Sequence, residues 1–139
     1  CFKRTVQEQI AAGRVILVEE ALWERPGTLL LKDDMANSGT VSVLPESQGH
    51  IVAEVRATTI DDTVRNLNLP RVDFIKMDIE GAERYAIRGG LETIRRFAPR
   101  MALCLYHRPD DPLVVPQSIL AIRREYHVFT RYVQYAYFY

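Results

Sequence analysis

Cysteine is scarce in this sequence of 139 residues, which contains only Cys1 and Cys104. Two cysteines at this spacing form neither a disulfide framework nor a metal-binding pattern. Cys104 lies in an apolar run, so we expect it to be a buried free thiol, as unpaired cysteines usually are.

Long apolar runs are also missing. No stretch approaches the about 20 apolar residues that a membrane-spanning helix requires. Residues 1–10 lack the apolar centre of a secretion signal. These absences predict a soluble cytoplasmic protein that has no membrane partner.

No excess charge of either sign is present, because 18 Lys and Arg residues balance 18 Asp and Glu residues. Broad electrostatic attraction to nucleic acids or anionic lipids is therefore not expected. With 47% hydrophobic and 26% charged residues, the composition is typical of one globular domain.

Apolar runs at residues 15–18, 72–77 and 101–105 predict buried strands, since such continuous runs are typical of parallel strands covered on both faces. Helical spacing of apolar residues predicts helices around 2–10, 60–67, 87–98 and 116–123. Thr59 suits the N-cap of the second helix, and Pro116 suits the first turn of the last. Strands that alternate with helices predict an α/β fold with a layered sheet.

Shorter β-rich pieces, separated by turn residues, lie at 28–31, 40–44 and 51–56, and they predict hairpin-like strands. The aromatic C-terminal stretch predicts two further strands, at 126–132 and 135–139. Too few residues separate these two strands for a crossover helix, so they must be antiparallel.

Two acids, Asp78 and Glu80, follow the strand expected at 72–77. Ligands of open α/β sheets bind outside the carboxyl ends of the strands. Clustered carboxylates repel one another unless a cation, hydrogen-bond donors or a helix N-terminus compensates, so this pair indicates a functional site. Glu83 also suits the acidic first turn of a helix, and Lys76 also suits a solvated position.

A histidine, His107, follows the next strand along the chain, which is expected at 101–105. Because parallel neighbouring strands end at the same edge of a sheet, we expect His107 to lie near Asp78 and Glu80. Imidazole is well suited to general-base chemistry near neutral pH. The sequence therefore predicts His107, Glu80 and Asp78 as the catalytic residues.

The run from Val72 to Glu83 reads Val-Asp-Phe-Ile-Lys-Met-Asp-Ile-Glu-Gly-Ala-Glu and continues with Ile-Arg-Gly-Gly-Leu at 87–91 and Pro99. This pattern resembles the signature of the FkbM family of S-adenosylmethionine-dependent methyltransferases. Further similar segments lie at 21–22, 59–62 and 106–111. The resemblance extends from about residue 15 to about residue 132.

The resemblance implies a class I methyltransferase sheet, which is Rossmann-like. Residues 15–18, 72–77 and 101–105 would be its third, fourth and fifth strands, and the aromatic tail its antiparallel final pair. The cofactor S-adenosylmethionine would contact Glu20, Ala21 and Leu22 with its adenine and Asp78 with its methionine end. The reaction implied is O-methylation of a hydroxyl group on a sugar or natural product, with His107, Glu80 or Asp78 handling the proton.

The sequence also departs from this family pattern. Its seven glycines form no Gly-x-Gly motif after a strand, and such a motif normally binds the cofactor. We therefore expect residues 1–139 to be a single partial methyltransferase domain, whose sheet is incomplete at the N-terminal side. It would lack the first two strands and the glycine-rich loop, so cofactor binding by this chain alone should be weak or nil.

Two alternatives stay open. Asp78 and Glu80 after a strand also suit a Mg²⁺-dependent phosphoryl-transfer site, for which Asp110 and Asp111 could supply further acids. The chain could instead be an inactive remnant or an interaction module, which would self-associate through the exposed edge of strand 15–18 or of the central strand, or through its aromatic tail. The acidic pair could also hold a divalent cation that lowers the pKa of the acceptor hydroxyl. No metal ligand is assigned, however, since two carboxylates alone do not define a metal site.

Overall fold

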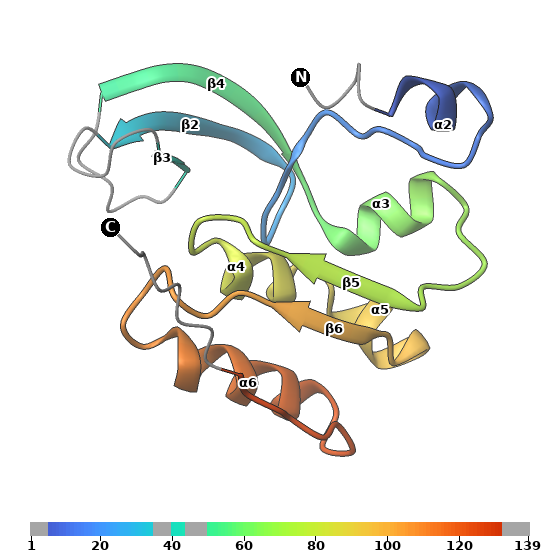
Figure 1. Cartoon of the computed structure of the whole chain (residues 1–139), viewed down its shortest axis with the longest axis vertical. Coiled ribbons are helices and arrows are strands. Elements are labelled where there is room, and N and C mark those ends of the chain that lie inside the picture. The colour runs from blue at the N-terminus through green and yellow to red at the C-terminus, as the bar shows by residue number, and fades with distance from the viewer. Residues whose placement is uncertain (1–5, 35–39, 44–49, 132–139) are drawn as a thin grey trace, which may run out of the picture.

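The computed structural model describes residues 6–34, 40–43 and 50–131 (Figure 1). Strands in the described residues form two separate sheets, one with the order β1-β4-β2-β3 and one that pairs β5 with β6. The strands are β1 (Ala21–Leu22), β2 (Gly27–Asp34), β3 (Thr40–Ser42), β4 (His50–Thr58), β5 (Phe74–Met77) and β6 (Arg100–Leu103). The helices are α2 (Gln7–Ala11), α3 (Ile60–Asn66), α4 (Glu83–Arg88), α5 (Leu91–Phe97) and α6 (Asp111–Ile122).

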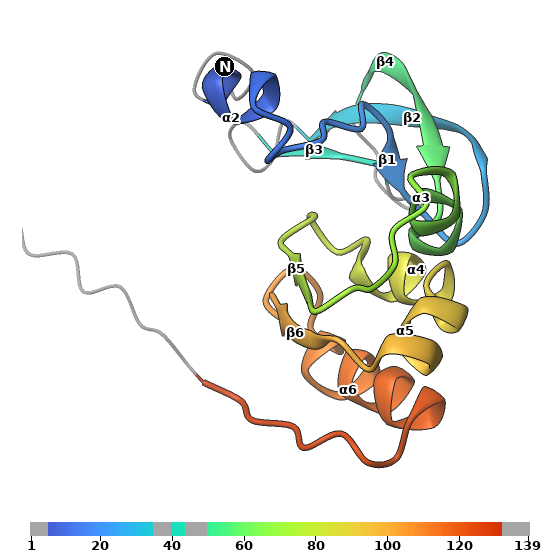
Figure 2. The same ribbon diagram turned by 90° about the vertical axis from the view of Figure 1, so that its right-hand side faces the viewer.

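Strands β5 and β6 are parallel neighbours, with Phe74 opposite Arg100 and Met77 opposite Leu103. Helices α4 and α5 form the crossover between them, as parallel strands require, and these helices lie on one side of the pair (Figure 2). The predicted strand–helix–strand unit is confirmed. The expectation that both faces of this sheet are covered is wrong for the described residues, because Phe74 is 58% exposed.

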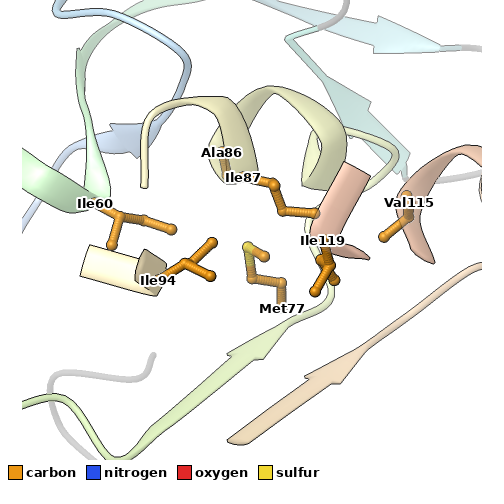
Figure 3. Packing of buried hydrophobic residues seen from close by; sticks show 7 residues of the cluster. All are labelled: Ile60, Met77, Ala86, Ile87, Ile94, Val115 and Ile119. Carbon is orange, nitrogen blue, oxygen red and sulfur yellow. The ribbon is translucent and has the colours of Figure 1, made fainter. Parts of the chain in front are cut away.

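The main core lies between these helices and the end of β5 (Figure 3). Its buried members come from α3, β5, α4, α5 and α6, and they are Ile60, Met77, Ala86, Ile87, Ile94, Val115 and Ile119. Burying one of the isoleucine, valine or methionine side chains of this cluster contributes about 1.5–3 kcal/mol relative to leaving it exposed. Met77 is only 2% exposed and immediately precedes Asp78, so the core fixes the position from which the predicted site begins.

The first residues of α3 and its N-cap residue provide caps for two helices. Thr59 is the N-cap of α3 and accepts a hydrogen bond from the amide of Asp62 at 2.9 Å, which confirms its predicted role. The Asp61 carboxylate accepts hydrogen bonds from the amides of Glu92 and Thr93, at the start of α5. Gly90, the N-cap residue of α5, has no side chain for this task, so Asp61 supplies the acceptor from another element.

The four-stranded sheet is a long antiparallel ribbon of β2 and β4, extended by β1 and β3 (Figure 1). It joins the rest of the molecule where β1 runs parallel to the end of β4. There the buried Trp23 stacks on Tyr85 of α4, with ring centroids 4.1 Å apart and an angle of 14° between the rings. Aromatic stacking of this kind connects the ribbon to α4.

The strand predicted at residues 15–18 is not formed. Ile16 is 59% exposed and Val18 is 37% exposed, and no neighbouring strand covers this run in the described residues. An apolar run becomes a buried strand only where neighbouring strands and helices cover it. The strand that follows, β1, pairs with β4 and not with β5, so the described residues do not form the single class I sheet that was expected.

Three further expectations differ from the structure. The helix expected up to residue 98 is two helices, because α4 ends at Arg88 and α5 begins at Leu91, on either side of Gly89 and Gly90. Pro116 lies inside α6, and Pro112 occupies the first turn instead. Residues 126–131 form no strand, and the strand expected at 135–139 lies outside the described residues.

Candidate functional site

The ends of β5 and β6 bring the three predicted catalytic residues together. Nε2 of His107 lies 3.5 Å from Oδ1 of Asp78 and 3.4 Å from Oε2 of Glu80. This convergence follows from the parallel arrangement of β5 and β6. The residues that follow β5 and the residues that follow β6 lie at the same edge of the sheet. Their proximity is as predicted, and their catalytic roles stay predictions.

A left-handed turn places Glu80 in this cluster. Glu80 has φ +55° and Gly81 has φ +85°. A non-glycine residue in this conformation costs about 1 kcal/mol or more, so the surrounding contacts must hold it there. One such contact is the hydrogen bond from the amide of Ile79 to Oε1 of Glu83, at 2.9 Å, which closes the turn onto α4.

Glu83 is a member of the cluster that the sequence left open between a site residue and a helix-start acid, and it was not among the predicted catalytic residues. Its side chain is fully buried, with 0% exposed, and its Oε1 lies 3.6 Å from Nδ1 of His107. The acidic first turn of a helix gave a sufficient explanation for Glu83, but such a residue is normally solvated. Its place on the helical turn that follows Asp78 and Glu80 was the signal available in the sequence.

Tyr106 also belongs to the site and was not singled out. Its hydroxyl donates a 2.7 Å hydrogen bond to Oδ1 of Asp78. This bond stabilises the ionised carboxylate, so it lowers the pKa of Asp78 below its ordinary value, and it raises the pKa of the Tyr106 phenol. The first shift keeps Asp78 negatively charged beside His107, and the second keeps the Tyr106 hydroxyl protonated as a hydrogen-bond donor.

A lysine and a thiol lie on the other side of Asp78. Nζ of Lys76 is 3.9 Å from Oδ2 of Asp78 and 3.7 Å from Sγ of Cys104. Burial is the main cause that raises the pKa of the Cys104 thiol above its ordinary value. Cys104 is a free cysteine, as predicted, and it is partly buried where the sequence predicted a buried residue.

The loop after His107 is held by a buried ion pair. Arg84 of α4 donates hydrogen bonds to Asp110, at 2.8 Å and 3.1 Å, and also to Asp111. Asp111 is fully buried and additionally accepts a hydrogen bond from the amide of Arg108 at 3.0 Å. Both aspartates that the phosphoryl-transfer alternative would need are therefore engaged by a guanidinium.

The predicted adenine-binding residues lie in the other sheet. Ala21 and Leu22 form β1, and Oε1 of Glu20 lies 3.7 Å from Nε of Arg56 on β4. Asp78, by contrast, follows β5. The structure thus divides the predicted cofactor residues between the two sheets.

A separate hollow of about 330 Å³ lies between α3 and α5 and contains none of the predicted site residues. Charged side chains line part of it, among them Asp61, Arg65, Glu92 and Arg96.

Across residues 6–34, 40–43 and 50–131, no helix combines the length and apolar character that crossing a membrane would take.

Comparisons with known proteins identify the family of the chain. The profile of the methyltransferase FkbM domain matches residues 6–131. Among solved structures, the crystal structure of methyltransferase FkbM from Methylobacillus flagellatus KT is similar, with a TM-score of 0.63 and 26% sequence identity. This match covers 90% of the chain and 27% of that protein's chain, so the sequence spans about 27% of the length of this relative.

No curated protein matches the chain. The family profile nevertheless extends over most of the sequence, including β1, the turn after β5 and the segment around His107. The resemblance predicted from residues 72–83 is confirmed: this chain belongs to the FkbM methyltransferase family.

Proposed function

We propose that the chain is part of an S-adenosylmethionine-dependent O-methyltransferase, which methylates a hydroxyl group of a sugar or natural product. The observation that carries this proposal is the position of His107, between the carboxylates of Asp78 and Glu80 at one edge of a parallel strand pair. Family membership supports the reaction type.

The residues present fit one part of the cofactor. The Glu20 side chain is 27% exposed and could accept hydrogen bonds from ribose hydroxyls, and β1 offers apolar surface for adenine. No Gly-x-Gly turn is available in the sequence for the methionine end. We therefore propose a partial domain, in which Glu20, Ala21 and Leu22 contact the adenosine and the remaining contacts come from outside these 139 residues.

When bound, S-adenosylmethionine supplies an electrophilic methyl group. The tasks left for this chain are to align the acceptor hydroxyl and to remove its proton. Nε2 of His107 is the proposed proton acceptor, and the nearby carboxylates of Asp78 and Glu80 stabilise the resulting imidazolium charge. Asp78 and Glu80 are 44% and 46% exposed, so they can also accept hydrogen bonds from other hydroxyls of the substrate.

Calorimetric titration with S-adenosylhomocysteine tests the cofactor assignment. It is done on the 139-residue chain and on a version extended upstream. Glu20→Gln in the form that binds should weaken binding about tenfold, which corresponds to about 1.4 kcal/mol. The matched control is Glu24→Gln, because Glu24 is engaged by Arg88 and should not contact the cofactor. Binding by neither form would contradict the proposal.

Methyl transfer to a panel of sugars and hydroxylated natural products tests the base. His107→Gln should lower kcat by about 10²- to 10⁴-fold, the usual contribution of a general base. Affinity for S-adenosylhomocysteine should stay unchanged in this variant. Unchanged kcat in His107→Gln would exclude the imidazole as proton acceptor.

A further inference from the structure

Three groups from separate parts of the chain form a compact set of metal-binding donors. Asp78 follows β5, Glu83 begins α4, and His107 follows β6. Each offers one ligand atom, and these atoms all lie within 4.8 Å of one another. Adjacent ligands around one small divalent cation are roughly 3 Å apart and opposite ligands roughly 4 Å, so only a small contraction would close the set on an ion.

Burial separates this set from an ordinary surface group of acids. The His107 side chain is 8% exposed, and neither of its ring nitrogens has a hydrogen-bond partner. Glu83 is 0% exposed, and its Oε2 also has no hydrogen-bond partner. Leaving a buried polar group without a partner costs about 1–3 kcal/mol, so these orphaned atoms call for a ligand. One cation can satisfy an imidazole nitrogen and a carboxylate oxygen together.

The charge around His107 is suited to a divalent ion. Asp78, Glu80 and Glu83 all lie within 4 Å of the imidazole. Lys76 contributes one positive charge beside Asp78. With a neutral imidazole, these groups leave an excess of two negative charges, which a divalent cation would neutralise.

We infer that Asp78, Glu83 and His107 bind a divalent cation, with Glu80 at its exposed side. One imidazole combined with carboxylates is a donor set that suits Mn²⁺, since carboxylates favour hard cations and imidazole favours transition metals. Asp78 and Glu80 are 44% and 46% exposed, so the ion faces solvent on the side where a substrate can approach.

The binding of the ion does not depend on the proposed function, but the catalytic role that we assign to the ion rests on it. A bound cation lowers the pKa of a coordinated hydroxyl, which makes its oxygen a better nucleophile. Without the ion His107 is the proton acceptor, as proposed above. With an ion on His107, the carboxylate of Glu80, 3.4 Å from the imidazole, would accept the hydroxyl proton in its place. Glu83, the buried member, then acts on the acceptor only through the ion.

Titration of the 139-residue chain with MnCl₂ tests the site, without cofactor or methyl acceptor. The electron paramagnetic resonance signal of free Mn²⁺ should show saturable binding of about one ion per chain. Nitrogen coupling in the pulsed spectrum of the bound ion should report the imidazole ligand and disappear in His107→Gln. Absence of saturable binding would overturn the inference.

Four variants locate the ion. Glu83→Gln, His107→Gln and Asp78→Asn should each weaken Mn²⁺ binding at least about tenfold. Glu92→Gln is the matched control, because Glu92 is 76% exposed on α5 and outside the cluster. The Glu83 side chain is buried, so Glu83→Gln could fail to fold. In that case Asp78→Asn still tests whether the ion binds at this cluster, because the Asp78 side chain is 44% exposed. Equal affinity in the folded cluster variants and the control would overturn the site.

Failure of this inference is distinguishable from failure of the proposed function. Mn²⁺ binding is measured without methyl transfer, and S-adenosylhomocysteine binding is measured without the ion. If the chain binds Mn²⁺ through His107, but neither the chain nor the version extended upstream binds S-adenosylhomocysteine, the result supports the inference and contradicts the function.

Discussion

Arg84, on α4, donates a hydrogen bond to the fully buried carboxylate of Asp111, the first residue of α6. The second oxygen of Asp111 accepts the amide of Arg108, next to His107 in the chain. Arg84 follows Glu83 directly in the first turn of α4. Glu83 contacts the imidazole of His107, and Arg84 holds Asp111 and thereby the loop that follows His107.

Arg84→Met should lower the free energy of unfolding by about 3–5 kcal/mol, because it leaves the buried Asp111 carboxylate without its charged partner. Urea unfolding monitored by fluorescence of Trp23, the single tryptophan, measures this. The control is Arg88→Met on the same helix, where the exposed pair with Glu24 should contribute less than about 1 kcal/mol. Equal losses in the two variants would show that burial does not decide the effect.

Tyr106→Phe should raise the pKa of Asp78 toward its ordinary value, since the hydroxyl that stabilises the ionised carboxylate is removed. A lowered pKa stabilises the fold above the ordinary value, and this contribution is lost as pH falls through the lowered value. The variant should therefore be less stable than the native chain at pH values above the ordinary pKa of Asp78. The difference in stability should vanish at pH values below the lowered pKa of Asp78.

Carbon-detected NMR titration of the Asp78 carboxyl measures this shift. Tyr126→Phe is the control, because that hydroxyl donates to the carbonyl of Pro99 and not to Asp78. An Asp78 titration that is the same in the native chain and in Tyr106→Phe would be inconsistent with the hydrogen bond.

Gly89→Ala should destabilise the fold by at least about 3 kcal/mol through overpacking. A Cβ at Gly89 would lie 2.2 Å from the backbone carbonyl oxygen of Trp23, which cannot move without displacing β1. A Cβ at Gly90 meets only side-chain atoms of Ile60, with Cδ1 at 3.0 Å and Cβ at 3.2 Å, so a small shift of this one side chain relieves the contact. Gly90→Ala should therefore change stability by no more than about 1 kcal/mol, and thermal unfolding of both variants makes the comparison.

Asp61→Ala should cost about 1 kcal/mol, because the amides of Glu92 and Thr93 lose their acceptor at the start of α5. Asp61→Asn retains one carbonyl oxygen and should lose about half as much. Urea unfolding distinguishes the three chains. An alanine variant as stable as the native chain would show that water replaces the carboxylate without cost.

The features that the sequence predicts well are those decided locally. Thr59 caps α3 because a side-chain oxygen and an amide three residues later need no distant partner. The convergence of Asp78 and His107 follows from strand polarity, which the strand–helix–strand order already imposes.

The features that were missed depend on what covers each segment. Residues 15–18 have the composition of a buried strand, yet Ile16 is 59% exposed because nothing in the described residues pairs with it. Glu83 has the position of a solvated helix-start acid, yet its side chain is fully buried against His107. Local sequence cannot report such burial, because it is decided by residues far along the chain.

The ribbon of β2 and β4 has a mechanical consequence. Along β4, residues 50–54 are exposed, whereas Ala57 and Thr58 are buried beside β1 and Trp23. The backbone hydrogen bonds between β2 and β4 near His50 can therefore break and re-form without disturbing the helices. Local opening of this kind begins where few side chains are buried. Deuterium uptake should thus run as a gradient along this one strand, fastest at His50 and slowest at Thr58, while amides of α4 exchange only when the whole chain opens.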